Sequence, residues 1–197
     1  MKDKSNKILS ITLALLIVVA AIIILYNNFL RNENQIENPD ENFQKNNIVL
    51  QTLYNDTYIN YTLDQLEKLE SITGYGGYIT SNNQTSGPYE LTGVKILILL
   101  KQFNITSEVY SINVKASDGY SKVFNLSYIN GEIPFFNENG EEIGIGDVTM
   151  IINYKENGEY LDDLIGPIRL AFICEDGFTS SKLWIKQVES IIIIDDF

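Results

Sequence analysis

The stretch VTMIINYKENGEYLDDLIGPIRLAFIC, residues 148–174, indicates most clearly which fold the chain adopts. Its first seven residues, Val148 to Tyr154, form an apolar run of strand length, and Asn157-Gly158 is a turn dipeptide. A second apolar run of strand length extends from Ile168 to Cys174. This part of the chain is therefore predicted to contribute strands to a β-sheet.

Further strands and two short helices are predicted outward from this stretch. Thr62-Leu-Asp-Gln65 is a capping-box pattern that opens a helix through Leu69, and the apolar run from Val94 to Phe103 predicts a second, buried helix. Asp118-Gly119 predicts a hairpin turn. The other strands are expected at 48–53, 71–80, 109–116, 122–126 and 183–194. The predicted fold class is α+β, a β-rich mixed-sheet domain with two short helices.

Three glycines interrupt the strand expected at 71–80. Gly74, Gly76 and Gly77 predict either a β-bulge or a place where another group approaches the backbone closely. Their spacing does not match a phosphate-binding loop. Trp184 is expected in the core, alternating with Lys186 and Val188 along the last strand.

The charge of the chain argues against nucleic acid as a partner. The 197 residues carry a formal net charge of −12, and the part after Arg31 has 10 basic against 25 acidic residues. Such a surface repels a phosphate backbone. Apolar residues make up 45% of the chain, which is enough to bury a core. We therefore expect one domain with a charged, solvated surface and no nucleic-acid partner.

Two residue types that carry much of enzyme chemistry are scarce. The chain has no histidine, so the commonest general base and the commonest zinc ligand are missing. Cys174 is the sole cysteine, so no intrachain disulfide can form. The apolar setting of Cys174, beside Phe172 and Ile173, favours a buried thiol that acts as a small hydrophobic group. A Ser-His-Asp or Cys-His mechanism cannot be written for this chain alone.

An uncharged segment near the N-terminus predicts attachment to a membrane. Residues 8–26 are 19 uncharged, mostly apolar positions, which match a hydrocarbon core of about 30 Å. Lysines precede the segment and acidic residues follow it, so residues 1–7 should be cytoplasmic and the domain extracytoplasmic. Residues 27–47 have the composition of a flexible tether, and 48–197 form the predicted domain. The alternative is a cleaved signal peptide, but the length of the segment favours an uncleaved anchor.

Five N-x-Ser/Thr sequons follow the tether. They can accept N-linked glycans, although a chain this rich in Asn, Ser and Thr also produces such triplets by chance. The possible acceptors are Asn55, Asn60, Asn83, Asn104 and Asn125.

The order of the motifs resembles a known family over roughly residues 61–194. INYKENGEYLDD at 152–163 looks like the "AYE-x-NG-x-PLP" segment of the molybdopterin-binding domain of sulfite oxidase-type oxidoreductases. GPIRL at 166–170 looks like that family's "G-x-P-[VL]-R-[LV]" strand. SKLWIKQV at 181–188 resembles its "S-x-K-W-[LV]-x-x-[IV]" end. Residues 89–103 and 115–126 resemble its "y-x-G-V-x-L-x-x-L-L" segment and its "A-x-D-G-Y" hairpin. The resemblance implies the family's fold, and molybdopterin as a cofactor.

The chain departs from the family where the metal would be held. The family's molybdenum ligand is a cysteine ahead of the "G-V-x-L" helix, but residues 71–84 contain no cysteine, and a soft metal needs a soft thiolate. Cys174 lies in a later strand and does not match that ligand. By resemblance, Arg169 is the candidate cofactor-binding residue, with Lys182 as a possible anion contact. The alternatives are an ion pair between Arg169 and a carboxylate such as Asp162 or Asp163, and a solvated Lys182.

Other chemistry has partial support in the sequence. Asn137 to Glu142 and Asp147 place oxygen ligands around a glycine, as calcium loops do, but a bidentate acid at the twelfth position is missing. Adjacent carboxylate pairs do not show the convergence that glycoside hydrolysis requires.

Three functional hypotheses follow from the sequence. The first is a membrane-anchored, non-catalytic binding or assembly module with an unknown protein or small-molecule ligand. The second is a molybdopterin-dependent oxidoreductase or redox-chain component with an atypical site. The third is a surface protein that displays glycans.

Overall fold

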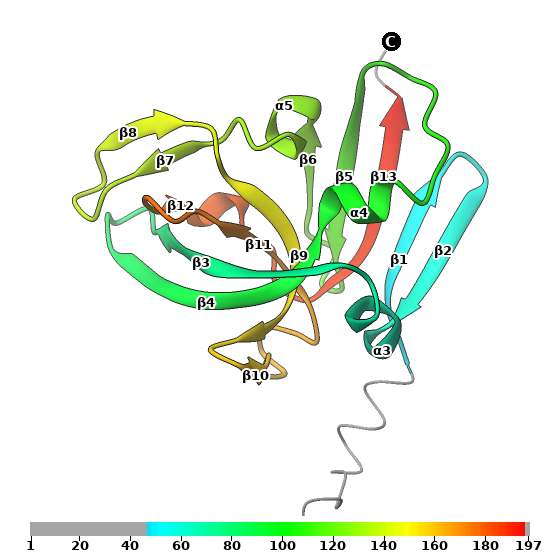
Figure 1. Cartoon of the computed structure of the whole chain (residues 1–197), viewed down its shortest axis with the longest axis horizontal. Helices are drawn as coiled ribbons and strands as arrows, with labels where there is room; N and C mark the ends of the chain where they lie inside the picture. Colours follow the sequence, from blue (N-terminus) through cyan, green and yellow to red (C-terminus); the bar gives the residue numbers. More distant parts are fainter. Residues whose placement is uncertain (1–46, 196–197) are drawn as a thin grey trace, which may run out of the picture. The chain divides into compact units, whose positions relative to one another are not determined.

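The computed structural model describes residues 47–195 (Figure 1). The predicted cytoplasmic N-terminus, the predicted transmembrane helix and all but the last residue of the predicted tether lie outside the described residues. Between residues 47 and 195, no helix has the length and hydropathy needed to cross a bilayer. The described part is β-rich, with mixed sheets and three short α-helices, as an α+β fold requires.

The first sheet, called sheet A, has five strands in the order β2-β1-β13-β5-β6. Its strands are β1 (Ile48–Tyr54), β2 (Thr57–Thr62), β5 (Tyr110–Ala116), β6 (Ser121–Asn125) and β13 (Val188–Asp195). β1 and β13 are parallel, and all other neighbours in sheet A are antiparallel. The last strand of the domain is therefore the middle strand of this sheet, beside the first one (Figure 1).

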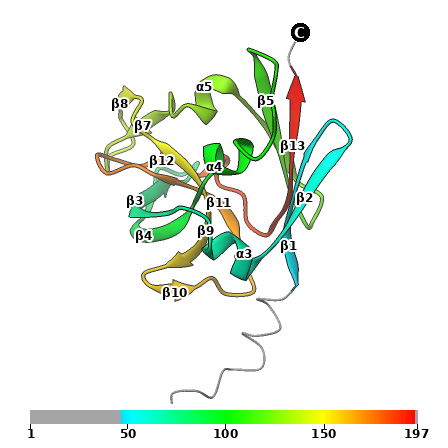
Figure 2. The same ribbon diagram turned by 45° about the vertical axis from the view of Figure 1, so that its right-hand side comes forward.

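The second sheet, called sheet B, has the order β10-β9-β4-β3-β12, with β11 also paired to β9. Its strands are β3 (Ser71–Ile79), β4 (Thr85–Lys95), β9 (Thr149–Glu156), β10 (Glu159–Tyr160), β11 (Arg169–Ile173) and β12 (Thr179–Ser180). The sheet curls, and just past the end of β11 the Cys174 amide donates to the Tyr75 carbonyl of β3 at 2.9 Å. A separate hairpin consists of β7 (Pro134–Phe136) and β8 (Glu142–Ile145) (Figure 2).

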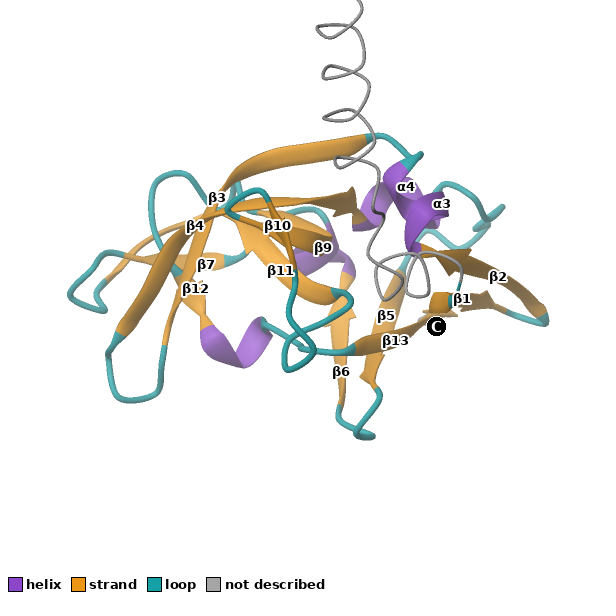
Figure 3. Cartoon of the chain, turned by 90° about the horizontal axis from the view of Figure 1, so that it is seen from below, coloured by secondary structure: helices purple, strands orange, loops and turns teal. Residues whose placement is uncertain are grey.

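Three α-helices and one 3-10 helix connect the strands (Figure 3). They are α3 (Leu63–Glu67), α4 (Ile96–Leu100), α5 (Leu126–Ile129) and the 3-10 helix η1 (Ser181–Leu183). The capping box predicted at Thr62 and Gln65 is confirmed, because each side chain accepts a hydrogen bond from the other residue's backbone amide.

One main core lies between the inner face of sheet A and sheet B. Apolar side chains from both sheets belong to a single buried cluster. Fully buried members include Leu50, Ile112 and Ile191 from sheet A, and Val94, Ile152 and Phe172 from sheet B. Burying each such side chain contributes about 1.5 to 3 kcal/mol, so this cluster is the main source of stability for the described domain.

The structure corrects several predicted elements. The helix predicted from Val94 to Phe103 is shorter, because β4 runs through Lys95 and α4 ends at Leu100. The strand predicted from 183 to 194 begins only at Val188. Trp184 is not part of a strand; it caps the end of η1 and is half-buried against the core. Helix α5 and six strands were not predicted: β2, β4, β7, β8, β10 and β12.

Candidate functional site

Arg169 begins β11 and its side chain points into the protein. Only 4% of the residue is exposed. Its Nε donates to Asn153 Oδ1 at 2.9 Å, its Nη2 forms an ion pair with Glu156, and its guanidinium lies 5.0 Å from the centre of the Trp184 ring. A guanidinium, which has several donors in one plane, suits this combination of two separate acceptors and a position over an aromatic ring.

The neighbours of Arg169 follow from the strand register. β9 and β11 are antiparallel with Arg169 opposite Asn153, so their side chains share one face of sheet B. Asn153 is fully buried, and its Nδ2 donates to the carbonyls of Thr92 and Lys155. The ion pair that the sequence offered as an alternative is present, but its carboxylate is Glu156 rather than Asp162 or Asp163. Asn153 and Glu156 were missed, although a polar residue inside the run MIINY was a usable signal.

The glycine segment of β3 is packed against β11 and the following loop. A Cβ on Gly76 would lie 2.0 Å from the Phe172 carbonyl oxygen, and one on Gly74 would lie 2.7 Å from an Ile173 methyl group. At Gly77 the Phe178 ring is 2.8 Å from the same position. The close approach that the glycines predicted is therefore an approach by protein backbone and side chains, and the bulge at Gly76 and Tyr78 is also present.

Cys174 follows β11 and is buried, with 5% of the residue exposed. It belongs to the main core cluster, as its apolar sequence context predicted. Burial raises the pKa of the Cys174 thiol, which keeps it in the protonated form that neither attacks electrophiles nor binds metals well.

These residues do not fit a molybdenum ion held in the manner of the sulfite oxidase family. No residue of 71–84 can supply a thiolate, Phe172, Ile173 and Phe178 occupy the space beside Gly74, Gly76 and Gly77, and the one thiol of the chain belongs to the core cluster. The guanidinium of Arg169 is already bound by Asn153 and Glu156.

Lys182 lies in a different place, at a polar hollow of about 160 Å³. The hollow opens beyond the ends of β3 and β12, beside the β7–β8 hairpin, and Arg169 does not line it. Lys182 is exposed and forms no ion pair among residues 47–195. The other lining residues are mostly hydroxyl and amide side chains: Ile79, Thr80, Ser81, Asn83, Phe136, Gly140 and Ser180.

The polar hollow can hold a small anion. Its one ionisable lining residue is a lysine, and hydroxyl and amide groups can donate to an oxyanion. Lys122 is close by, since its Nζ donates to the Lys182 carbonyl at 3.1 Å. Ligand pockets for drug-sized molecules usually measure about 300 to 1,000 Å³, so this hollow suits an inorganic oxyanion or a single small group.

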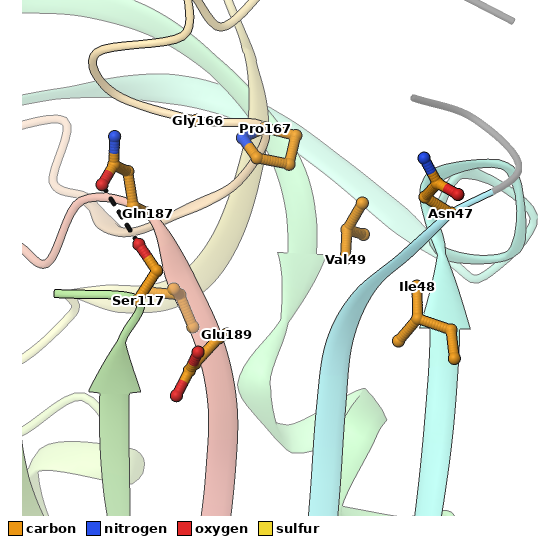
Figure 4. A pocket seen from close by; sticks show the side chains of 9 residues that line it. Asn47, Ile48, Val49, Ser117, Gly166, Pro167, Gln187 and Glu189 are labelled. Carbon is orange, nitrogen blue, oxygen red and sulfur yellow. Dashed lines mark hydrogen bonds between the residues drawn. The ribbon is translucent and has the colours of Figure 1, made fainter. Parts of the chain in front are cut away.

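A larger hollow, of about 460 Å³, lies where β1 and β13 begin (Figure 4). Val49 and Pro167 provide apolar walls, and the Ser117 hydroxyl donates to Gln187 at 3.1 Å on one side. Its one ionisable lining residue is Glu189. This hollow contains neither of the two predicted cofactor contacts.

The remaining candidate residues are distributed over the surface. All five sequon asparagines are exposed, which a glycan acceptor requires, although Asn125 also caps α5. The predicted oxygen cluster at residues 137–142 forms the β7–β8 turn, where Asn137 bonds the Asn139 and Glu141 amides. Within residues 47–195 no group of three or more His, Cys, Asp or Glu side chains is placed to hold a metal ion.

Comparison with known proteins supports the fold more than the family. No family model matches the chain, and no curated protein matches it. Among solved structures, the sulfane dehydrogenase SoxCD from Paracoccus pantotrophus superposes with a TM-score of 0.54 at 17% sequence identity. The match covers 75% of this chain but only 38% of the length of the dehydrogenase chain. At this identity the likeness shows a shared fold alone, and it agrees with the oxidoreductase-type fold expected from the motifs.

Proposed function

We propose that this chain is a membrane-anchored, extracytoplasmic binding module that has an oxidoreductase-type fold and does not perform molybdenum chemistry. The observation that carries the proposal is the packing of the Gly74–Gly77 segment. Phe172, Ile173 and Phe178 occupy the space beside these glycines, and Arg169 is held by Asn153 and Glu156. Because function depends on a site rather than on a fold, the shared architecture with a dehydrogenase does not transfer its activity.

The ligand of the module is a small oxyanion bound at the polar hollow. Lys182 supplies the charge there, and Thr80, Ser81 and Ser180 supply hydroxyl groups. Because Lys182 is exposed, water and salt weaken its contact with an anion, which contributes only about 1 to 1.5 kcal/mol to binding.

The anchoring part of the proposal depends on residues 8–26. Their 19 uncharged positions and the lysines that precede them support a single span with a cytoplasmic N-terminus. Carbonate extraction and protease protection of the intact chain test this part. Release of the chain into the soluble fraction, or protection of the domain inside the cell, would contradict it.

Analysis of metal and pterin distinguishes the module from the second candidate, a molybdopterin-dependent oxidoreductase. The intact chain is purified from a host that makes the cofactor, and molybdenum and released pterin are measured against a cofactor-free host. We expect background levels of both. Stoichiometric molybdenum together with pterin fluorescence would support the enzyme and overturn the proposal. The likeness to the sulfane dehydrogenase SoxCD is what supports this second candidate.

Calorimetry tests the anion site separately. Inorganic phosphate and sulfate are titrated into the intact chain and into the Lys182→Gln variant. We expect the variant to bind about tenfold more weakly, or about 1.4 kcal/mol. Lys186→Gln is the matched control, because Lys186 is equally a surface lysine close in sequence and does not line the hollow. Equal loss in both variants would show that only the overall charge matters.

A further inference from the structure

The outer face of sheet A presents apolar side chains to solvent. Tyr58, Val123 and Ile194 are 63%, 56% and 39% exposed, and Leu53 and Ile192 beside them are half-buried. The strand register places four of these side chains in one row across all five strands. The row is Tyr58, Leu53, Ile192, Asn113 and Val123, each paired with the next.

The next row on the same face is polar and has little charge. It contains Asn60, Gln51, Ser190, Lys115 and Ser121, again each paired with the next. Lys115 is the one charged residue in the two rows, and Glu189 lies beside it at the edge of the shallow hollow that Gln51, Leu53 and Ile192 also line. The other nine residues of the two rows are uncharged. Depletion of charge and enrichment of aromatic and apolar groups mark an interface.

We infer that this face packs against the same face of a second copy of the chain, around a two-fold axis that runs parallel to β13. β13 is the middle strand of the five, with two strands on each side. Such an axis places Ile192 against Ile192 of the second copy and Tyr58 against Val123 of the second copy. Gln51 then meets Lys115 of the second copy, and Glu189, at the start of β13 and the edge of the face, is the one acidic residue that comes near its own copy across the axis.

The size of the face is sufficient for such a contact. Five strands about 4.8 Å apart and about seven residues long present roughly 550 Å² on each copy. Two copies together bury roughly 1,100 Å², which exceeds the roughly 1,000 Å² expected of a specific interface. Attachment to one membrane, as proposed above, also raises the effective concentration of the two copies. The proposed axis keeps both copies of Asn47, where the chain enters β1, at the same end of the dimer.

Site-directed crosslinking in cells that express the full chain tests the proposal. Cys174 is buried, so a cysteine introduced at the surface is the reactive one. The Ile192→Cys variant should give at least about tenfold more covalent dimer with a short bismaleimide than Ile145→Cys, because facing sheets lie about 10 Å apart. Ile145 is the matched control: it is an apolar residue, 65% exposed, on β8. Equal crosslinking of the two variants would overturn the inference.

A mixed pair of variants tests the position of the axis. Tyr58→Cys and Val123→Cys chains with different tags are expressed together, and the crosslink between the two different chains should exceed that within either kind. A crosslink that joins Ile192→Cys to another protein, or an intact glycan on Asn60, would each contradict the dimer, because either would cover the face. The anion site and the metal analysis use other residues, so their outcomes do not depend on this one.

Discussion

Replacing Arg169 by methionine measures how much the buried contacts of this arginine contribute to the free energy of unfolding. The substitution keeps an unbranched side chain of comparable length but removes the donor to Asn153 Oδ1 and the partner of Glu156. Asn153 is fully buried, and leaving a buried acceptor unsatisfied costs about 1 to 3 kcal/mol. The Glu156 side chain is 22% exposed, so water recovers part of the lost ion pair. We expect a total loss of about 3 kcal/mol in the free energy of unfolding.

Denaturant unfolding of the domain, residues 47–197, gives this loss as a shift of the midpoint at constant m-value. Lys68→Met is the matched control, because Lys68 pairs with Asp64 while 72% of its side chain is exposed. That variant should change the free energy by less than about 0.5 kcal/mol. A loss below about 1 kcal/mol for Arg169→Met would refute the reasoning, since the guanidinium would then be free to bind a ligand.

Three further predictions concern the packing and the buried ionisable groups. Gly76→Ala should lower the free energy of unfolding by more than about 3 kcal/mol, because the new Cβ would collide with the Phe172 carbonyl. Its control is Gly158→Ala, which should lower this free energy by about 1 kcal/mol, because Gly158 has a positive φ but open space around it. The Cys174 thiol should react with an aromatic disulfide reagent far more slowly in the native chain than in denaturant, and equal rates would contradict its burial. Burial raises the pKa of Tyr61 and of Tyr154 above 10, so the native state holds protons that the unfolded state releases. The stability that these two tyrosines contribute is therefore full below about pH 10 and falls as the pH rises further, and an alkaline unfolding series with no loss of stability above about pH 10 would contradict this.

Part of the fold could be predicted because local signals agreed with the tertiary structure. The capping box at Thr62, the turns at Asp118-Gly119 and Asn157-Gly158, and the apolar runs of β9 and β11 all lie where the sequence placed them. The helix predicted from Val94 to Phe103 was too long, because the periodicity of a short apolar stretch does not distinguish a helix from a buried strand. Its first residues pair with β9, and pairing partners distant in sequence are not visible locally.

The candidate site shows the same division between local and long-range information. The sequence indicated that something approaches the backbone at Gly74–Gly77 and that Arg169 could pair with a carboxylate. It could not identify Phe172 as the neighbour or Glu156 as the partner, because both depend on the register of β9, β11 and β3. Lys182 was noted from a motif, but the hollow around it is assembled from β3, β12 and the β7–β8 hairpin.

Hydrogen exchange at the Cys174 amide is the most direct test of whether the space beside the glycine segment is closed. This amide donates to the Tyr75 carbonyl at 2.9 Å and joins the end of β11 to β3. In the intact chain we expect it to exchange as slowly as the amides of the interior strand β9, because opening it requires β11 and β3 to separate. Exchange as fast as that of the exposed Gly158 amide would show an open seam between β3 and β11, with room for a cofactor, and would contradict the account.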